Sequence, residues 1–246
     1  MQKPRILPVG DSGLLLEFGK TIDPDLQAQV SALDNILSMF PHLAISEWVP
    51  TYRSLMVYYD PLQISYTALA EWLLNWLQQP VNAEGMARRQ VTIPVFYGGT
   101  MGPDLDNVAA HNGLTPEEVI RLHQEPDYLV YMLGFLPGFP YLGGLDQRLC
   151  TPRLATPRTN VPAGSVGIAD RQTGVYPLAS PGGWQLIGRT PLKLYDPRRS
   201  QPFLLAAGDV LRFQAVTQEE FDRIAAAVEG DPKSSRNCAM PKGVAK

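Results

Sequence analysis

The sequence predicts an α+β protein in which a small N-terminal two-layer α/β domain, residues 1–88, precedes a β-barrel domain, residues 89–229. Strand and helix signals follow the order ββαββα before residue 79, as in a two-layer domain of one sheet and its helices. Eleven of the 21 glycines lie between residues 131 and 208, where short apolar segments alternate with turns. Such closely spaced strands favour a closed or nearly closed barrel over parallel βαβ units.

Capping residues mark where the two helices of the N-terminal domain begin. Asp23 stands before Pro24, and an aspartate cap with proline in the first turn is a common helix start. We expect this helix to end near Phe40 and a second helix to be capped by Ser65. The expected strands of this domain span residues 5–9, 14–18, 45–49 and 55–59.

The second domain is expected to begin after a break over residues 79–90. Asp104 is predicted to cap a short helix that stops before Gly113. Thr115 and Glu118 form a capping box, in which each side chain bonds the backbone N–H of the other residue. We therefore expect strands over residues 91–96 and 128–133, and helices over residues 105–111 and 116–123.

The end of the chain is predicted to hold one more helix and a tail. Thr217 and Glu220 form another capping box, which opens a helix that reaches Val228. Residues 230–246 carry four Lys or Arg and one acid, and we expect them to be a disordered tail.

Basic charge gathers on the glycine-rich stretch. Residues 128–208 contain eight Arg or Lys against three Asp, although the whole chain has a net charge of -3. Arginine offers paired donors to a carboxylate or phosphate, and glycine lets bare N–H groups approach closely. Arg153 and Arg158 each follow a proline, whose fixed backbone lowers the entropy lost on clamping an anion. We expect a small-anion site here; the alternative is that the arginines are solvated and the glycines only serve turns.

Several other side chains are candidates for the same site. Ser165 lies in AGSVG, which lacks the first glycine of a nucleophile elbow, and all three histidines precede it, so an α/β-hydrolase triad is excluded. Ser165 either donates to the anion or bonds its own turn. His123 is the candidate general acid/base because histidine titrates near neutral pH, although a helix C-terminus also favours histidine through its dipole. The remaining candidates for binding the anion are Gln172, Thr173, Tyr176, Gly182 and Gly183.

Composition and motifs exclude several classes of protein. A net charge of -3 argues against a nucleic-acid partner. No apolar run approaches the roughly 18 residues of a membrane span, and the N-terminal sequence lacks the apolar core of a signal peptide, so we expect a cytoplasmic protein with no membrane partner. Cys150 and Cys238 form no Cys/His ligand pattern, and there is no HExxH motif, so no protein-held metal is expected.

Five long motifs in a fixed order carry a family resemblance. The chain closely resembles the family of allophanate hydrolase subunit 1, the B subunit of 5-oxoprolinase and the sporulation kinase inhibitor KipI, a carboxyltransferase C and D domain, through GFLPGFPYLGGL, PRLATPR, VPAGSVGI, QTGVYPLASPGGWQLIGRTP and AAGDVLRF. The resemblance covers about residues 5–215 and is far more specific than a short motif. It implies that the barrel domain is cyclophilin-like.

The resemblance implies one leading function. This is the B subunit of a bacterial ATP-dependent 5-oxoprolinase, which opens 5-oxo-L-proline to L-glutamate with ATP hydrolysis. It implies a complex with a C subunit, similar to allophanate hydrolase subunit 2, and with an A subunit. Because the sequence contains no ATP motif, we expect ATP and its accompanying Mg²⁺ on the partner or in a shared site, and we expect the isolated chain to be inactive.

Two alternatives stay open. The chain could inhibit the autophosphorylation of a sensor histidine kinase, as KipI-like proteins do. It could also be the carboxyltransferase subunit of a urea carboxylase and allophanate hydrolase system. In that case biotin must arrive on another protein, because the chain has no AMKM-type biotinylation site.

Overall fold

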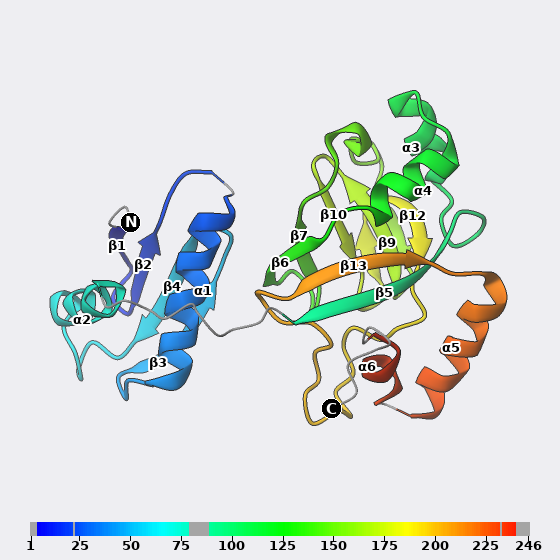
Figure 1. Cartoon of the computed structure of the whole chain (residues 1–246). Helices are drawn as coiled ribbons and strands as arrows, with labels where there is room; N and C mark the ends of the chain where they lie inside the picture. The colour runs from blue at the N-terminus through cyan, green and yellow to red at the C-terminus, as the bar shows by residue number, and fades with distance from the viewer. Residues whose placement is uncertain (1–3, 22, 79–88, 232, 240–246) are drawn as a thin grey trace. The chain divides into compact units, whose positions relative to one another are not determined.

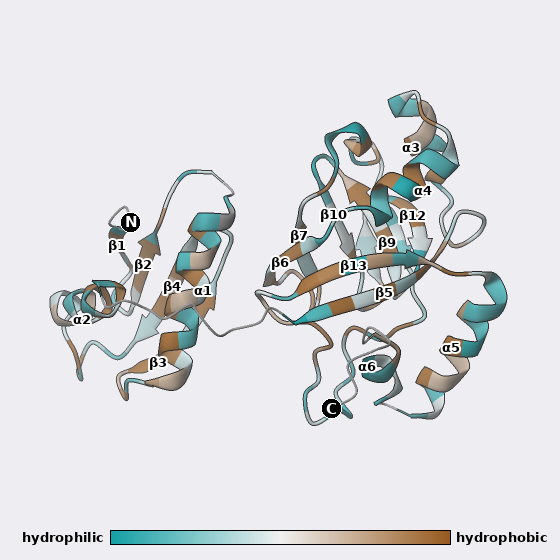
Figure 2. Ribbon diagram, viewed as in Figure 1, coloured by the Kyte–Doolittle hydropathy of each residue, from teal (hydrophilic) through white to brown (hydrophobic). Residues whose placement is uncertain are grey.

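In the computed structural model the chain divides into two compact units, Met1–Ala87 and Arg88–Lys246 (Figure 1). Each unit has its own sheet and its own cluster of buried apolar side chains. Apolar and polar residues alternate along many of the strands, as expected of sheets that bury one face (Figure 2). The structure describes residues 4–21, 23–78, 89–231 and 233–239.

The first unit is an antiparallel four-stranded sheet with two helices, in the predicted element order. Its strand order is β1-β2-β4-β3. Leu14 and Leu16 are fully buried and Leu15 between them is not, because neighbouring strand residues point to opposite faces. The predicted cap at Ser65 is confirmed, since its Oγ accepts the N–H of Ala68 at 3.3 Å. The elements are β1 (Arg5–Val9), β2 (Gly13–Glu17), α1 (Pro24–Met39), β3 (Ile45–Pro50), β4 (Ser54–Tyr59) and α2 (Tyr66–Gln78).

The second unit is built on a mixed seven-stranded sheet with the order β10-β9-β12-β5-β13-β6-β7. Neighbouring strands are antiparallel except β5 and β13, which run parallel and lie side by side in Figure 1. The two edge strands, β7 and β10, also contact each other, so the sheet nearly closes on itself. This is the barrel-like sheet that the sequence predicts. Its strands are β5 (Gln90–Tyr97), β6 (Tyr128–Leu133), β7 (Pro140–Gly143), β9 (Ser165–Ala169), β10 (Gln172–Val175), β12 (Gln185–Arg189) and β13 (Val210–Ala215).

Helices and a short strand pair cover this sheet. Helix α3 contacts β12, α4 contacts β13, and both α5 and α6 contact β5. Strands β8 and β11 pair with each other in a separate two-stranded sheet. The elements are α3 (Leu105–Asn112), α4 (Pro116–Gln124), the 3₁₀ turn η1 (Gln147–Leu149), β8 (Arg158–Val161), β11 (Ser180–Gly182), α5 (Gln218–Gly230) and α6 (Ser234–Ala239).

Strand alternation gives the second unit two cores. Val166 and Ile168 of β9 belong to the large core, whereas Ala169 belongs to a smaller one. On β12, Ile187 joins the large core and Leu186 the smaller one. Successive side chains of a strand face opposite sides, so the two cores lie on opposite faces of this part of the sheet. The smaller core carries the candidate site.

Three of the predicted helix starts are confirmed in detail. Asp23 accepts the N–H of Asp25 at 2.8 Å. The Thr115 and Thr217 capping boxes are both complete, with each threonine accepting from the backbone of a glutamate three residues later. These contacts are local in sequence, and this is why the sequence predicts them.

The prediction for Asp104 is wrong in one respect. Asp104 does precede α3, but its side chain makes no hydrogen bond to the start of that helix. Its two carboxylate oxygens accept instead from Arg158 and from the backbone N–H of Leu186. Partners distant in sequence have displaced the local cap.

The prediction of a disordered tail from residue 230 is also wrong for part of its length. Ser234–Ala239 forms α6, in which Ser235 and Ala239 are buried. The Oγ of Ser235 accepts the N–H of Lys193 at 3.1 Å. Charge composition predicts disorder, but burial of small side chains depends on tertiary contacts that composition does not report. The rest of this prediction, residues 240–246, lies outside the described residues.

Candidate functional site

An aromatic cluster forms the floor of the candidate site. We define it as Phe139, Tyr141, Tyr176 and Trp184. The ring of Phe139 lies 5.4 Å from those of Tyr176 and Trp184, at interplanar angles of 84° and 90°. Edge-to-face packing of this kind places the positive ring edge against the negative ring face. The cluster is therefore a rigid part of the smaller core, in which Phe139, Tyr176 and Trp184 are buried and Tyr141 is partly exposed.

Two glycines let the backbone pass close to these rings. A Cβ on Gly174 would lie 3.0 Å from the Cζ of Phe139 and 3.1 Å from the Cζ3 of Trp184. A Cβ on Gly182 would lie 2.5 Å from the hydroxyl oxygen of Tyr176. Any larger residue would have to displace a packed ring. These glycines thus serve close approach rather than a special backbone angle.

Arg158 is held at the edge of the aromatic cluster. Its Nη2 donates to Oδ1 of Asp104 at 2.7 Å, and its Nη1 donates to the carbonyl of Trp184 at 3.4 Å. The strand pairing of β8 with β11 places Arg158 opposite Gly182. The side chain is 28% exposed, so part of the guanidinium still faces solvent. The position of Arg158 is therefore fixed while its charge is partly compensated.

Arg153, like Arg158, acts on the ring of Tyr176, but its side chain is held more loosely. Its Nε is 3.6 Å from Oδ2 of Asp170, and the two side chains are 59% and 66% exposed. Exposed pairs of this kind contribute little to stability. Burial raises the pKa of Tyr176, while the Trp184 backbone and the charges of Arg153 and Arg158 lower it by less. Both guanidinium groups therefore act on one tyrosine, as expected of a shared site.

His123 lies in the large core, away from this surface. It is 0% exposed, and both ring nitrogens are hydrogen-bonded at 2.8 Å, Nδ1 with the hydroxyl of Tyr97 and Nε2 with that of Thr173. The hydroxyl proton of Thr173 goes to the carbonyl of Gly167. Nε2 therefore carries the ring proton, and Nδ1 accepts from Tyr97.

The environment of His123 keeps the imidazole neutral. Burial lowers its pKa from 6.5 to about 3. With no exposed surface and both nitrogens occupied, His123 has no path for exchanging a proton with a substrate. The geometry supports the structural alternative over the general acid/base role expected from the sequence.

The structure brings some of the predicted residues together and separates others. Arg153, Arg158, Tyr176 and Gly182 lie at the aromatic cluster, and Gly183 follows Gly182 directly after the end of β11. Thr173 does not join them. It neighbours Gly174 on β10 and so faces the opposite side of the strand, where it meets His123.

Two further candidates present little surface to a ligand. Ser165 is on the same face of β9 as Ala169 but is only 2% exposed. Gln172 is partly buried and already engaged by other groups of the protein. The anion-binding prediction is thus narrowed to Arg153, Arg158 and the glycines at the end of β11, Gly182 and Gly183.

Two residues of the site are not found from the sequence. Asp104 has the pattern of a helix cap, and nothing local indicates a partner 54 residues away in the chain. Phe135 lies in the loop between β6 and β7, is 68% exposed, and has a φ of 67°. Its ring is 5.8 Å from that of Phe139, so it extends the aromatic cluster to the surface. A strained, exposed aromatic residue is a recognisable sign of function only once its backbone angle is known.

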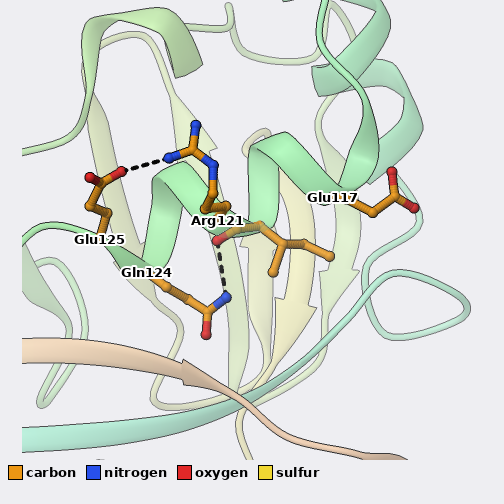
Figure 3. Close-up of a pocket in the computed structure, with 5 residues that line it drawn as sticks. Glu117, Arg121, Gln124 and Glu125 are labelled. Atoms are coloured by element: carbon orange, nitrogen blue, oxygen red, sulfur yellow. Dashed lines mark hydrogen bonds and ion pairs between the residues drawn. The ribbon is translucent and has the colours of Figure 1, made fainter.

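A hollow on α4 lies elsewhere and is less suited to an anion. It is lined by Glu117, Ile120, Arg121, Gln124 and Glu125 (Figure 3). Arg121 donates to Glu125 at 3.0 Å, and the Gln124 amide donates to the carbonyl of Ile120 at 3.2 Å. Arg121, the basic residue of this hollow, is therefore already paired with Glu125.

The described residues offer neither a metal-binding cluster nor a membrane-spanning helix. Among the described residues there is no group of three or more His, Cys, Asp or Glu side chains arranged to hold a metal ion. No helix in the described ranges is both long and apolar enough to cross a bilayer.

Comparison with known proteins establishes the family. Residues 4–205 match the family described as carboxyltransferase domain, subdomain C and D. The chain belongs to this family. It is 41% identical to the B subunit of 5-oxoprolinase from Bacillus subtilis, over 88% of this chain and 95% of that protein. It is 45% identical to the B subunit of 5-oxoprolinase from Escherichia coli O157:H7, over 89% of this chain and 99% of that protein.

A solved structure supports the fold of this member of the carboxyltransferase domain family. The crystal structure of the urea amidolyase of K. lactis matches 95% of this chain and 16% of that much longer chain, with a TM-score of 0.72 and 23% identity. At that identity the likeness concerns the fold alone. The family resemblance predicted from the five motifs is confirmed by the family match, and the two bacterial relatives are named as subunits of an enzyme.

Proposed function

We propose that this chain is the B subunit of an ATP-dependent 5-oxoprolinase, a hydrolase that opens 5-oxo-L-proline to L-glutamate. The observation that carries the proposal is 41% and 45% identity along almost the full length of two proteins with that name. The matches run through both units of the chain rather than through one motif. Shared architecture at this level of identity supports a shared role in the complex.

The reaction needs groups that hold anions. The lactam amide is stabilised by resonance, and ATP, when bound, would supply a phosphoryl group to the amide oxygen, which makes the carbonyl carbon more open to attack by water. The ring C–N bond then breaks, and its nitrogen becomes the amine of glutamate. The chain's own contribution is to bind and orient. The charges of Arg153 and Arg158 both act on Tyr176, and their guanidinium groups offer N–H donors that suit the substrate carboxylate or phosphoryl oxygens. The aromatic cluster next to these arginines would exclude water from one side of the bound lactam ring.

The site is incomplete within this chain, which supports a shared site. The charge of Arg158 is already partly compensated by Asp104, and Arg153 is largely exposed. The described residues also offer no cluster of acidic side chains for Mg²⁺. We therefore place ATP and Mg²⁺ on the C subunit, the partner similar to allophanate hydrolase subunit 2, or at its contact with this chain; the A subunit then makes the enzyme complete. The exposed ring of Phe135 beside the site fits a surface that a partner covers.

The test is release of ADP on addition of 5-oxoproline to this chain, to the C subunit, and to their mixture with the A subunit. We expect turnover only in the complete mixture. Arg153→Ala should lower kcat/KM for 5-oxoproline by about tenfold or more, because one charge-assisted contact is lost. Arg223→Ala, at an exposed arginine on α5, is the matched control and should leave turnover unchanged.

Absence of turnover in every mixture, with the complex shown to be intact, would overturn the proposal. The next experiment would then be the alternative of kinase inhibition, measured as autophosphorylation of a sensor histidine kinase with and without this chain. Carboxylation of urea in the presence of a biotin-bearing partner would test the remaining alternative.

A further inference from the structure

A second basic site lies in the C-terminal part of the second unit, in a hollow of about 540 Å³. The loop after β12 and the segment that carries α6 form its walls. Four basic side chains line it, Arg198, Arg199, Lys233 and Arg236. None of them belongs to the candidate site at the aromatic cluster.

The nearby carboxylates are already engaged. Asp196 accepts from Nε of Arg198 at 2.9 Å and from its Nη2 at 2.6 Å, and these hydrogen bonds hold the pKa of Asp196 below its usual range. Asp231 lines the hollow, and its Oδ1 accepts the backbone N–H of Lys233 at 2.9 Å. Four cations thus line the hollow, against one carboxylate in its wall, Asp231, and a second, Asp196, that is paired with Arg198.

Arg199 is the unusual member of the group. It is only 7% exposed, and its Nη2 donates to the carbonyl of Lys193 at 2.7 Å. Its Nε and Nη1, and the Nε of Arg236, have no acceptor within the described part of the chain. Buried donors without acceptors are costly, and a buried guanidinium especially so. Burial lowers the pKa of Arg199, the charge of Asp196 raises it by less, and the charges of Arg236 and Arg198 lower it again.

We propose that this hollow binds a phosphate group. A phosphate dianion would supply acceptors for the unpaired nitrogens of Arg199 and Arg236, and its tetrahedral oxygens can accept from donors on different walls. Its double charge also matches the excess of two cations that remains when Asp231 in the wall and Asp196 paired with Arg198 are both counted. Free inorganic phosphate and the phosphate of a nucleotide share this chemistry. The proposal is independent of the reaction at the aromatic cluster.

The test is titration of the full chain by calorimetry with inorganic phosphate, and separately with ADP, at constant ionic strength set with chloride. We expect saturable binding at one site for at least one of the two probes. Arg199→Met and Arg236→Gln should each weaken it by about tenfold or more. Arg223→Gln, an exposed arginine on α5 outside the hollow, is the matched control and should bind as the wild type does.

Each outcome decides the proposal. Binding of phosphate identifies the free ion as sufficient, and binding of ADP alone identifies a nucleotide. No saturable binding of either probe to the folded wild type overturns the proposal, and so does binding that Arg236→Gln leaves unchanged. Arg236 is partly exposed on α6, so this variant stays informative if Arg199→Met fails to fold.

Discussion

The guanidinium of Arg158 lies 2.7 Å from Oδ1 of Asp104, and the other oxygen of that carboxylate accepts the backbone N–H of Leu186 at 2.6 Å. One carboxylate thus joins strand β8, the start of helix α3 and strand β12. Asp104 is 8% exposed, so its removal would leave Arg158 without its charged partner in a partly buried place. The arginine of the candidate site is positioned by a structural ion pair.

We expect Asp104→Ala to lower the free energy of unfolding by about 2 kcal/mol or more, because two charge-assisted hydrogen bonds are lost. Urea denaturation measures this change. Asp106→Ala, at an exposed residue on α3, is the matched control and should stay within about 0.5 kcal/mol of the wild type. Equal effects of the two substitutions would show that the ion pair does not stabilise the fold.

The buried His123 predicts how stability depends on pH. Its pKa is about 3 in the folded chain and 6.5 when unperturbed. Between these values the unfolded chain binds a proton that the folded chain does not, so stability falls as pH drops below about 6.5. This residue contributes up to about 1.4 kcal/mol per pH unit. The advantage of wild type over His123→Gln in urea denaturation should therefore narrow from about pH 7.5 to about pH 5.

A control and a second readout accompany this prediction. His111→Gln, at an exposed histidine on α3, should show no such narrowing. In the assembled enzyme a folded His123→Gln variant should retain turnover, because neither ring nitrogen of His123 is free in the wild type. Loss of turnover in an intact complex would instead support a general acid/base role for His123.

Two neighbouring glycines offer a matched pair of substitutions. In Gly182→Ala the new methyl would lie 2.5 Å from the Tyr176 hydroxyl oxygen, whereas in Gly183→Ala its nearest neighbour is Pro157 at 3.6 Å. Gly182→Ala should destabilise the chain by about 1–3 kcal/mol through overpacking, and Gly183→Ala by much less. Thermal unfolding of both variants checks this. If both shift the midpoint equally, close approach to Tyr176 is not the reason for glycine at position 182.

The exposed ring of Phe135 predicts a contact with another protein of the complex. Asparagine tolerates a positive φ, so Phe135→Asn keeps the backbone conformation and removes the aromatic surface. The isolated variant should be as stable as the wild type, and its affinity for the C subunit should fall by about tenfold or more. Leu62→Asn, at a residue that is also highly exposed but belongs to the first unit, is the control. Unchanged assembly would remove Phe135 from the interface; binding is measured by calorimetry.

Much of the fold could be predicted because its signals are local. The capping boxes at Thr115 and Thr217 and the alternation along β2 depend on residues a few positions apart. The ordered motifs likewise identified the family before any geometry was known. The run of basic charge and the rigid prolines in the sequence also predict Arg153 and Arg158 as candidates for the site.

The remaining features depend on contacts between distant residues. The sequence alone determined the order of the elements in the first unit, the family and the basic character of residues 128–208. Only the tertiary structure decided that His123 is buried and neutral, that Asp104 holds Arg158 rather than its own helix, and that α6 completes a basic hollow with Arg199. The physical reason is that pKa, burial and hydrogen-bond partners are set by groups brought together in space, whereas composition and periodicity report only neighbours along the chain.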